Sequence, residues 1–311
     1  MIVFTDNVAC AESFIEPEED WGSAAFYGRE QELCEPAGKI FTDGPVLRNT
    51  CRSVRPWRCG FIRKEAPSSH FDLLIELYRE KGMPASGLVC LAASGIDFHG
   101  QRKRPWVALE GNLHLTAFLS PQKEIAGGGT AFPVLAAVSL VETIDAVGGF
   151  RTPPEIKWVN DILIGGAKVA GFLVHTFTVE KTVSAVVLGI GLNVTRAPRL
   201  SRDRFVTETA SLRDFHSRPS AIDCKGVLSR LLERIGMNYG LLLEGRYSEL
   251  LDLYRKRSMV LGRRVRIRTD PEEGKSTEIA AGKVLRIGEY LDLWLSGRRE
   301  PVTKGRLMLD D

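Results

Sequence analysis

The chain lacks several features that define common classes of protein. Its six cysteines are scattered and form no Cys-x-x-Cys pair, which argues against a disulfide framework or a zinc site and favours reduced thiols in a cytoplasmic protein. The formal net charge is only +3, too small for nucleic acid to be the main partner. No apolar run approaches the length needed to span a bilayer, and the first residues lack the basic start and apolar stretch of a signal peptide.

The length and composition indicate a protein with a sizeable core. With 311 residues, of which 44% are hydrophobic and 26% charged, the chain exceeds one ordinary domain. We expect three parts, with boundaries at 1–60, 61–246 and 247–311. The first is rich in Gly, Pro and acidic residues, and it carries two similar segments, Phe-Thr-Asp-Asn at 4–7 and Phe-Thr-Asp-Gly at 41–44. It lacks the paired apolar helices of a helix-turn-helix, so we predict a structural extension packed on the core.

The middle part mixes patterns typical of strands and of long helices. The expected strands are residues 88–92, 113–119 and 184–194, and the expected helices are residues 132–147 and 224–243. This mixture favours an α+β domain in which helices cover one face of a mostly antiparallel sheet. Such a sheet leaves its other face for a ligand.

The last part reads as short strands separated by glycines. Residues 261–268 alternate apolar and basic side chains, and further short strands are expected at 284–287, 290–295 and 306–309. This spacing predicts a small C-terminal β-barrel. The arginines at 264, 266 and 268 are interpreted as a solvated strand face, and a role beside a nucleotide or an acidic carrier protein stays open.

Three motifs in the middle part carry the densest chemical signal. They are Lys157-Trp158-Val159-Asn160-Asp161-Ile162, Gly166-Ala167-Lys168-Val169-Ala170-Gly171 and Gly189-Ile190-Gly191-Leu192-Asn193-Val194. The first two predict a strand hairpin that turns at Gly165-Gly166. Ammonium groups, amides and one carboxylate on glycine-joined strands are the chemistry of a polyanion site. A lone lysine beside a strand is more often only solvated, but three motifs in sequence favour the binding site.

These motifs resemble those of the biotin protein ligases, within the wider biotin and lipoate ligase family. That family carries Lys-Trp-Pro-Asn-Asp, then Gly-x-Lys-hydrophobic-Ala/Gly-Gly, then Gly-hydrophobic-Gly-hydrophobic-Asn-Val, in this order. Here Val159 replaces the proline, and His175 stands where the family usually has a glutamate. The resemblance spans roughly residues 65–309. It implies the biotin/lipoate ligase catalytic fold, which is class II synthetase-like, followed by an SH3-like β-barrel.

Upstream of these motifs the resemblance is partial. Residues 98–106 resemble the family's Gly-Arg-Gly-Arg-x-Gly-Arg-x-Trp loop, which closes over the acyl-adenylate, but Phe98, His99, Gln101 and Lys103 replace two glycines and two arginines. A loop with fewer glycines is stiffer, and displaced arginines hold the intermediate less tightly. Read without the family, this stretch is an exposed basic loop. The next strand, from Glu110 to Leu115, resembles Gly-Asn-Leu-Tyr-Leu.

The resemblance also implies a substrate contact at the start of an apolar helix. Pro67-Ser68-Ser69-His70 precedes a helical pattern of apolar residues, where the family has Ser-Thr-Asn in contact with the ureido ring of biotin. By base rate, a serine in this position is a helix cap. Both readings of Ser69 stay open. The substrate-binding set implied overall comprises Ser69, Gly100, Gln101, Arg102, Arg104, Trp106, Gly111, Asn112, Lys168 and Gly171.

The implied reaction has two steps. Biotin attacks the α-phosphate of ATP to give biotinyl-5'-AMP, and the amine of a lysine on a carrier domain then attacks this mixed anhydride. Lys157 is the expected catalytic residue, because a compact cation neutralises both anions. Asn160 and Asn193 are expected to contact the nucleotide with Lys157, while Arg102 and Arg104 clamp phosphates. Asp161 is expected to support Mg²⁺ through water, although a turn-capping aspartate is an equal alternative.

The expected ligands and partners follow from the same resemblance. They are ATP, Mg²⁺, biotin as substrate, and the biotin carboxyl carrier domain of a carboxylase, with no nucleic acid and no membrane; a homodimer stays open. Two other functions stay open as well. One is a lipoate or octanoate ligase, which shares the fold and the lysine. The other is a sensor that binds biotin or its adenylate without turnover. Whether His99 or His175 compensates for missing family residues is also left open.

Overall fold

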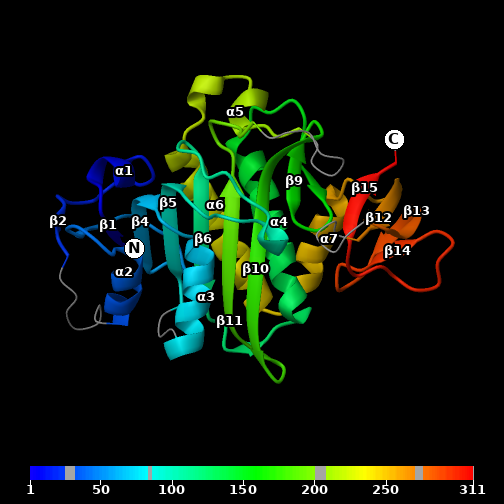
Figure 1. The fold of residues 1–311 in the computed structure, drawn as a ribbon, viewed down its shortest axis with the longest axis horizontal. Coiled ribbons are helices and arrows are strands. Elements are labelled where there is room, and N and C mark those ends of the chain that lie inside the picture. Colours follow the sequence, from blue (N-terminus) through cyan, green and yellow to red (C-terminus); the bar gives the residue numbers. More distant parts are fainter. Residues whose placement is uncertain (25–31, 83–85, 200–207, 270–275, 311) are drawn as a thin grey trace.

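The computed structural model describes residues 1–24, 32–82, 86–199, 208–269 and 276–310, which form a large sheet with helices on its faces and a small second sheet (Figure 1). The strands are β1 (Ile2–Thr5), β2 (Gly22–Ser23), β3 (Leu47–Thr50), β4 (Cys59–Ala66), β5 (Leu88–Gly95), β6 (Leu113–Leu119), β7 (Lys123–Glu124), β8 (Glu155–Lys157), β9 (Asp161–Ile164), β10 (Ala167–Val179), β11 (Thr182–Leu192), β12 (Arg264–Arg268), β13 (Glu278–Ile287), β14 (Leu293–Leu295) and β15 (Arg306–Leu309). The α-helices are α1 (Val8–Glu12), α2 (Cys34–Ile40), α3 (His70–Lys81), α4 (Ala131–Val147), α5 (Leu212–Phe215), α6 (Cys224–Leu243) and α7 (Tyr247–Arg257).

The large sheet has the strand order β2-β3-β1-β4-β5-β6-β11-β10-β9-β8, and β7 pairs with β11. Among the described strands, only β1–β4 and β4–β5 pair in parallel in this sheet. The predicted α+β class with a mostly antiparallel sheet is therefore confirmed. The glycine turn after β9 is also confirmed, since Ile164 pairs with Ala167 across Gly165-Gly166.

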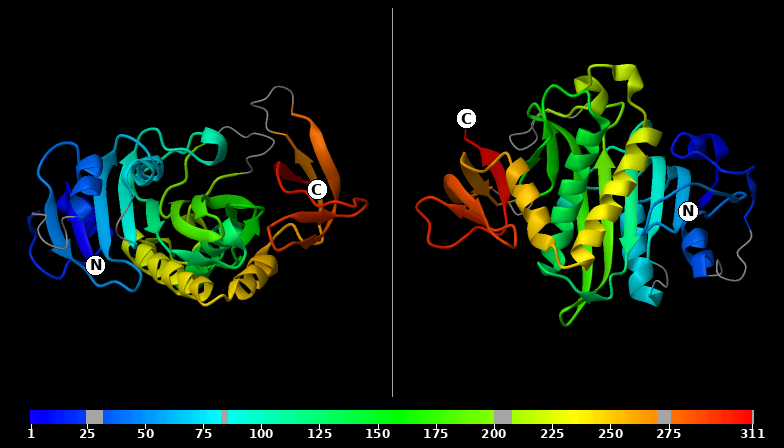
Figure 2. Two further views of the ribbon diagram at one scale, coloured as in Figure 1. Left: turned by 90° about the horizontal axis from the view of Figure 1, so that it is seen from below. Right: turned by 180° about the vertical axis from the view of Figure 1, so that it is seen from behind.

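The two faces of the sheet are covered unequally. The long helices α4, α6 and α7 lie across one face (Figure 2, right). On the other face α2 and α3 pack over the first strands, where Leu74 of α3 joins Phe61 and Phe118 in a second buried cluster. Beyond α3 the strands β6, β11 and β10 leave room on this face for a cavity.

Helix α4 is the central helix of the core. The segment Gly128–Val147 is long and apolar enough to span a membrane by composition, with a mean hydropathy of 1.6, so the expectation that no apolar run reaches this length was wrong. In the structure 67% of the 18-residue apolar window in this segment is buried inside the protein. Its polar residues are used internally, because Thr143 donates to the Ser139 carbonyl and Asn238 of α6 donates to the Ser139 hydroxyl. These contacts are typical of a core helix.

The first sixty residues contribute strands to the large sheet. Strand β1 lies between β3 and β4, and β2 pairs with β3. Arg63 of β4 links this region to the rest of the sheet: its guanidinium contacts the Ile40 carbonyl, Asp43 at 2.7 Å and Asp6 at 3.7 Å. Asp6 and Asp43 are the acidic residues of the two similar sequence segments, so both segments converge on one buried arginine.

Replacing Arg63 with methionine is expected to destabilise the fold by about 1–3 kcal/mol, because the buried Ile40 carbonyl loses its charged donor. Urea unfolding measures the change. The matched control is Arg52→Met, since the Arg52 side chain is 97% exposed and its ion pair with Glu18 spans 3.9 Å. Equal midpoints for the two variants would show that Arg63 does not join the N-terminal strands to the core.

The second sheet has the order β14-β13-β12-β15 and is antiparallel among its described strands. On β12 the side chains of Arg264 and Arg266 are exposed while those of Val265 and Ile267 are buried. The prediction of a solvated strand face is thus confirmed for Arg264 and Arg266, whereas Arg268 is half-buried and donates to Ser276. The SH3-like barrel topology and the domain boundaries stay predictions.

Candidate functional site

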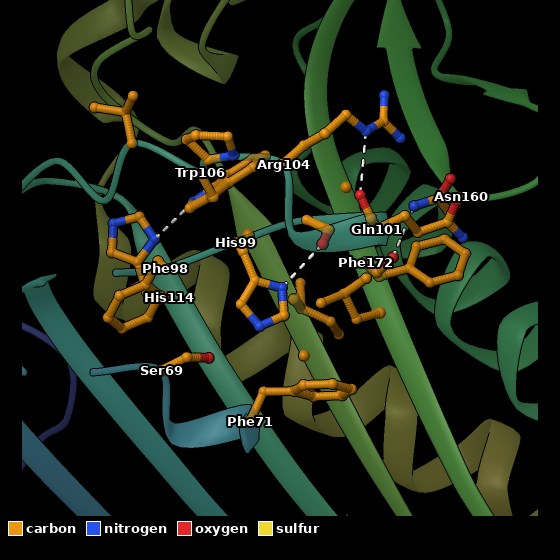
Figure 3. Close-up of a pocket in the computed structure, with 18 of the residues that line it drawn as sticks. Ser69, Phe71, Phe98, His99, Gln101, Arg104, Trp106, His114, Asn160 and Phe172 are labelled. Atoms are coloured by element: carbon orange, nitrogen blue, oxygen red, sulfur yellow. Dashed lines mark hydrogen bonds between the residues drawn. The ribbon is translucent and has the colours of Figure 1, made fainter. Parts of the chain in front are cut away.

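Two adjoining cavities lie on the open face of the large sheet. The first has a volume of about 150 Å³ and is bounded by the start of α3, the loop at 98–107 and strands β6, β10 and β11 (Figure 3). Its walls are mainly apolar and aromatic, with a few polar groups that converge on it. The residues that line it include Ser69, Phe71, Phe98, His99, Gly100, Gln101, Arg104, Trp106, His114, Asn160, Asp161, Lys168, Gly171, Phe172, Gly191 and Asn193.

The second cavity has a volume of about 220 Å³ and is mainly polar. It lies between the loop, the turn from β8 to β9 and the segment 303–307 that leads into β15. Its cationic residues are Arg102, Arg104, Lys157, Lys304 and Arg306. Gln101, Arg104, Asn160 and Asp161 border both cavities. The apolar cavity therefore adjoins a strongly cationic one.

Lys157 ends β8 at the edge of the cationic cavity, directly opposite Asp161 in the ladder with β9. Its side chain is largely buried. Burial lowers the pKa of Lys157 below its ordinary value, and the cations Lys168, Arg306 and Arg104 lower it further, while Asp161 opposes them. A buried ammonium group surrounded by other cations creates a strong positive potential, which favours a bound polyanion.

Lys168 and Asp161 form an ion pair between β10 and β9, with 2.6 Å between Nζ and Oδ1. The ammonium group also lies 5.7 Å from the centre of the Trp106 ring. Gly171 leaves space for this side chain, because a Cβ at residue 171 would come to 3.1 Å from Lys168 Nζ. The partner of Asp161 is thus a lysine across the hairpin.

Trp106 forms a flat wall of the apolar cavity. Its ring lies against Gly191 of β11, and its indole N–H donates to His114 Nδ1 at 3.3 Å (Figure 3). The other ring nitrogen of His114 donates to the Leu109 carbonyl at 3.0 Å. Burial lowers the pKa of His114 to about 4, so the ring is neutral near pH 7 and can accept the indole proton.

Two polar side chains face the apolar cavity with unused hydrogen-bonding capacity. Asn193 donates from its amide to the Ala210 carbonyl at 3.0 Å, and its buried Oδ1 has no partner among the described residues. Ser69 precedes α3 as the N-cap residue, but its side chain makes no capping hydrogen bond. Ser69 thus occupies the N-cap position that the helix-cap interpretation expects, but its hydroxyl makes no capping bond among the described residues and remains available to a ligand.

The structure brings together all the residues expected at the site except Gly111 and Asn112, which border neither cavity. Asn112 is fully buried and uses its amide oxygen to accept the N–H group of Val194 at 2.9 Å. Gly111 has φ of +89° and contacts Thr195. Both residues thus support the segment that follows Asn193.

The sequence did not single out several residues that the structure adds. Lys304, Gly305 and Arg306 reach the cationic cavity from the C-terminal sheet, and His114 and Phe71 line the apolar one. The two basic residues on either side of Gly305 were the sequence feature that could have indicated this part of the cationic cavity. His175, left open at first, packs against Phe177 with 4.6 Å between ring centres and borders neither cavity.

Known proteins similar to this chain come from one group of ligases. The model of the biotin/lipoate A/B protein ligase family matches residues 75–193. The bifunctional ligase/repressor BirA of Bacillus spizizenii is 31% identical over 186 residues, covering 59% of this chain and 55% of that protein. The biotin--[acetyl-CoA-carboxylase] ligase of Paracoccus denitrificans is 38% identical over 120 residues, covering 38% and 48%. The chain thus spans about half the length of these curated relatives.

Among solved structures, the biotin protein ligase from Aquifex aeolicus in complex with biotin and ATP has a TM-score of 0.61 to this chain. The match covers 81% of this chain and 98% of that one at 21% sequence identity. At this identity the likeness establishes a shared fold.

Proposed function

We propose that this chain, which carries a domain of the biotin/lipoate A/B protein ligase family at residues 75–193, is an ATP-dependent biotin protein ligase. It forms biotinyl-5'-AMP and transfers the biotinyl group to a lysine of a carrier domain. The observation that supports this most strongly is the apolar cavity for an organic acid beside a cationic cavity for a triphosphate. An acid and ATP held in these cavities would meet at the four residues that border both.

In the first step two anions have to approach each other. Biotin is assigned to the apolar cavity, with Ser69 as a polar contact and the carboxylate directed towards Arg104 and Asn160. Lys157 would neutralise the carboxylate and the α-phosphate as negative charge builds up there, and Arg102 and Arg104 would hold phosphate oxygens. Gly100, Gln101, Lys168 and Gly171 complete the proposed substrate contacts.

The adenine is assigned to the end of the apolar cavity near Trp106 and Asn193. The indole ring offers a stacking surface, and the unpaired Oδ1 of Asn193 is suited to accept a hydrogen bond from the exocyclic amino group.

Mg²⁺ would enter with the triphosphate, whose charge it neutralises. Asp161 is the carboxylate that borders both cavities, and one carboxylate fits an ion that keeps most of its ligands as phosphate and water.

In the second step the amine of the carrier lysine attacks the acyl-adenylate and releases AMP. This step depends mainly on proximity and on the exclusion of water. The domain division at 60 and 246, the carrier partner and a cytoplasmic location remain part of this proposal. The six free cysteines are compatible with a reducing compartment.

The transfer reaction tests this proposal. The protein, ATP, Mg²⁺ and biotin are incubated with an unmodified biotin carboxyl carrier domain, and incorporation is followed by mass spectrometry. We expect one biotinyl group per carrier, and none on a carrier whose acceptor lysine is replaced by arginine. Incorporation of lipoate or octanoate instead would assign the protein to the other branch of the family. Binding of biotin with no turnover would indicate a sensor.

The lowered pKa of Lys157 predicts a shift in the pH dependence of adenylation. The active form is the ammonium cation, so activity falls as pH rises through the pKa of Lys157, which lies below the ordinary 10.5. The alkaline limb of kcat/KM for ATP, which reports on the free enzyme, should therefore have its midpoint below 10.5. In Lys157→Arg this limb should move upward, because arginine keeps its proton. An unmoved limb would assign the titration to another group.

A further inference from the structure

The loop at residues 98–105 forms part of the wall of the apolar cavity and is closed by its own backbone hydrogen bonds. The backbone N–H of Trp106 donates to the Phe98 carbonyl at 2.8 Å, and the backbone N–H of Gly100 donates to the Arg104 carbonyl at 2.7 Å. These bonds make the loop a compact hairpin, but they do not attach it to the rest of the protein.

Two kinds of contact join this loop to the body of the protein: the Phe98 ring packs against Gly95 and His114, and the carboxylate of Asp72 supplies polar contacts. Asp72, in the first turn of α3, has its Oδ2 2.6 Å from His99 Nε2 and 2.9 Å from Lys103 Nζ. The other ring nitrogen of His99 faces the Gly100 carbonyl at 2.9 Å, and Lys103 Nζ lies 3.0 Å from His99 Nε2, so Asp72, His99 and Lys103 form one polar cluster. Charge-assisted hydrogen bonds of this length are among the stronger polar contacts in proteins.

The electrostatics of this contact support a specific role. Partial burial alone would raise the pKa of Asp72, but hydrogen bonds from Lys103 and His99 outweigh it and hold the pKa below its ordinary value. The His99 ring also meets the edge of Phe71, with 6.5 Å between ring centres. Since Ser69 precedes the same helix, the contact joins one wall of the cavity to the loop that forms another.

The loop backbone indicates that this contact is needed. Arg102 and Lys103 have φ values of +56° and +57°. This left-handed backbone conformation is unfavourable for residues other than glycine. Lys103 nevertheless adopts it, and in this conformation its ammonium group reaches Asp72. The contact with Asp72 compensates for the unfavourable backbone and selects this arrangement of the loop.

We propose that Asp72 is a positioning residue that holds the loop at 98–105 in the wall of the apolar cavity through His99 and Lys103. Resting on the proposed function, we further assign to this contact the slow release of the acyl-adenylate. His99 and Lys103 stand where the ligase family has an arginine and a glycine, so two positions of the family's loop carry side chains that here fasten the loop to α3. Retention then depends on a contact within the protein.

The position of the loop is tested by limited proteolysis of the folded protein without substrates. Trypsin can cut after Arg102, and cleavage at this bond is followed by mass spectrometry in the parent protein, Asp72→Asn and the control Glu76→Gln, an exposed carboxylate one turn further along α3. We expect Asp72→Asn to be cut roughly tenfold faster at this bond, because losing one hydrogen bond to a charged group shifts the loop equilibrium by about that factor. Cleavage of Glu76→Gln should be unchanged. Lys103→Met should raise cleavage similarly, and the double variant should show no further increase.

A second experiment separates loop position from ligand retention. Dissociation of chemically synthesised biotinyl-5'-adenylate is measured by stopped flow in the same variants, and it should be faster in Asp72→Asn and partly restored in Asp72→Glu. If the adenylate does not bind at all, the proposed function fails while proteolysis still decides the role of Asp72. Equal cleavage after Arg102 in the parent protein and Asp72→Asn would overturn the positioning role. Faster cleavage with unchanged dissociation would overturn the assignment of retention.

Discussion

Replacing Lys157 with alanine is expected to slow formation of the acyl-adenylate by about a hundred- to a thousandfold, the cost of removing one preorganised charge at a reacting centre. Lys157 is the largely buried cation at the border of the cationic cavity, opposite Asp161. Single-turnover experiments with saturating biotin and ATP measure this rate. The loss should appear mainly in the chemical step and less in substrate binding, because the charge that Lys157 balances builds up during the reaction.

The control for this variant is Lys256→Ala, which removes an exposed lysine of α7 and should leave the rate unchanged. Stability distinguishes loss of chemistry from loss of fold. Burial and neighbouring cations disfavour the charge on Lys157, so the alanine variant should unfold at no lower urea concentration than the parent protein. A rate within twofold of the parent would remove Lys157 from the mechanism.

A single methyl group added at Gly191 is expected to weaken nucleotide binding by roughly tenfold or more, the range for overpacking a filled site. A Cβ at this position of β11 would come to 2.3 Å from the ring of Trp106, which has to move. The indole would then lose its hydrogen bond to His114 and its place in the cavity wall. Isothermal titration of Gly191→Ala with ATP measures the affinity, and tryptophan fluorescence reports the displaced ring.

Gly240→Ala provides the matched control. Gly240 lies in α6, where an added Cβ meets no atom of the described residues within 4 Å, so alanine should leave binding intact and raise stability by up to about 1 kcal/mol. Unchanged affinity in Gly191→Ala would show that Trp106 does not form part of the nucleotide site. Equal losses in both variants would point to a general effect on the fold.

The sequence predicted the fold best where one local pattern decides the structure. Helix α6 occupies the predicted residues 224–243, and β6 occupies 113–119, because a single apolar period identifies each. The N-terminal strands were missed, since β1 is four residues long and pairs with β4 nearly sixty residues away. Such pairing depends on distant contacts that a local pattern does not contain.

The candidate site divides in the same way. Lys157, Lys168 and Asn193 lie in contiguous sequence motifs, and the structure places all three at the two adjoining cavities. Arg306 and Asp72 lie in other elements, and only the folded chain brings them to the loop and the cationic cavity. Ser69 shows the limit of base rates: it stands at the N-cap position that its residue type favours, but its hydroxyl makes no capping bond among the described residues.

The most direct test of the central claim is isotope exchange between pyrophosphate and ATP, with biotin, lipoate and octanoate offered separately to the purified protein. The proposed ligase predicts exchange stimulated by biotin and lost in Lys157→Ala. Exchange driven only by lipoate or octanoate would contradict the assignment of biotin. Absence of exchange with all three acids would contradict the proposed adenylation reaction itself.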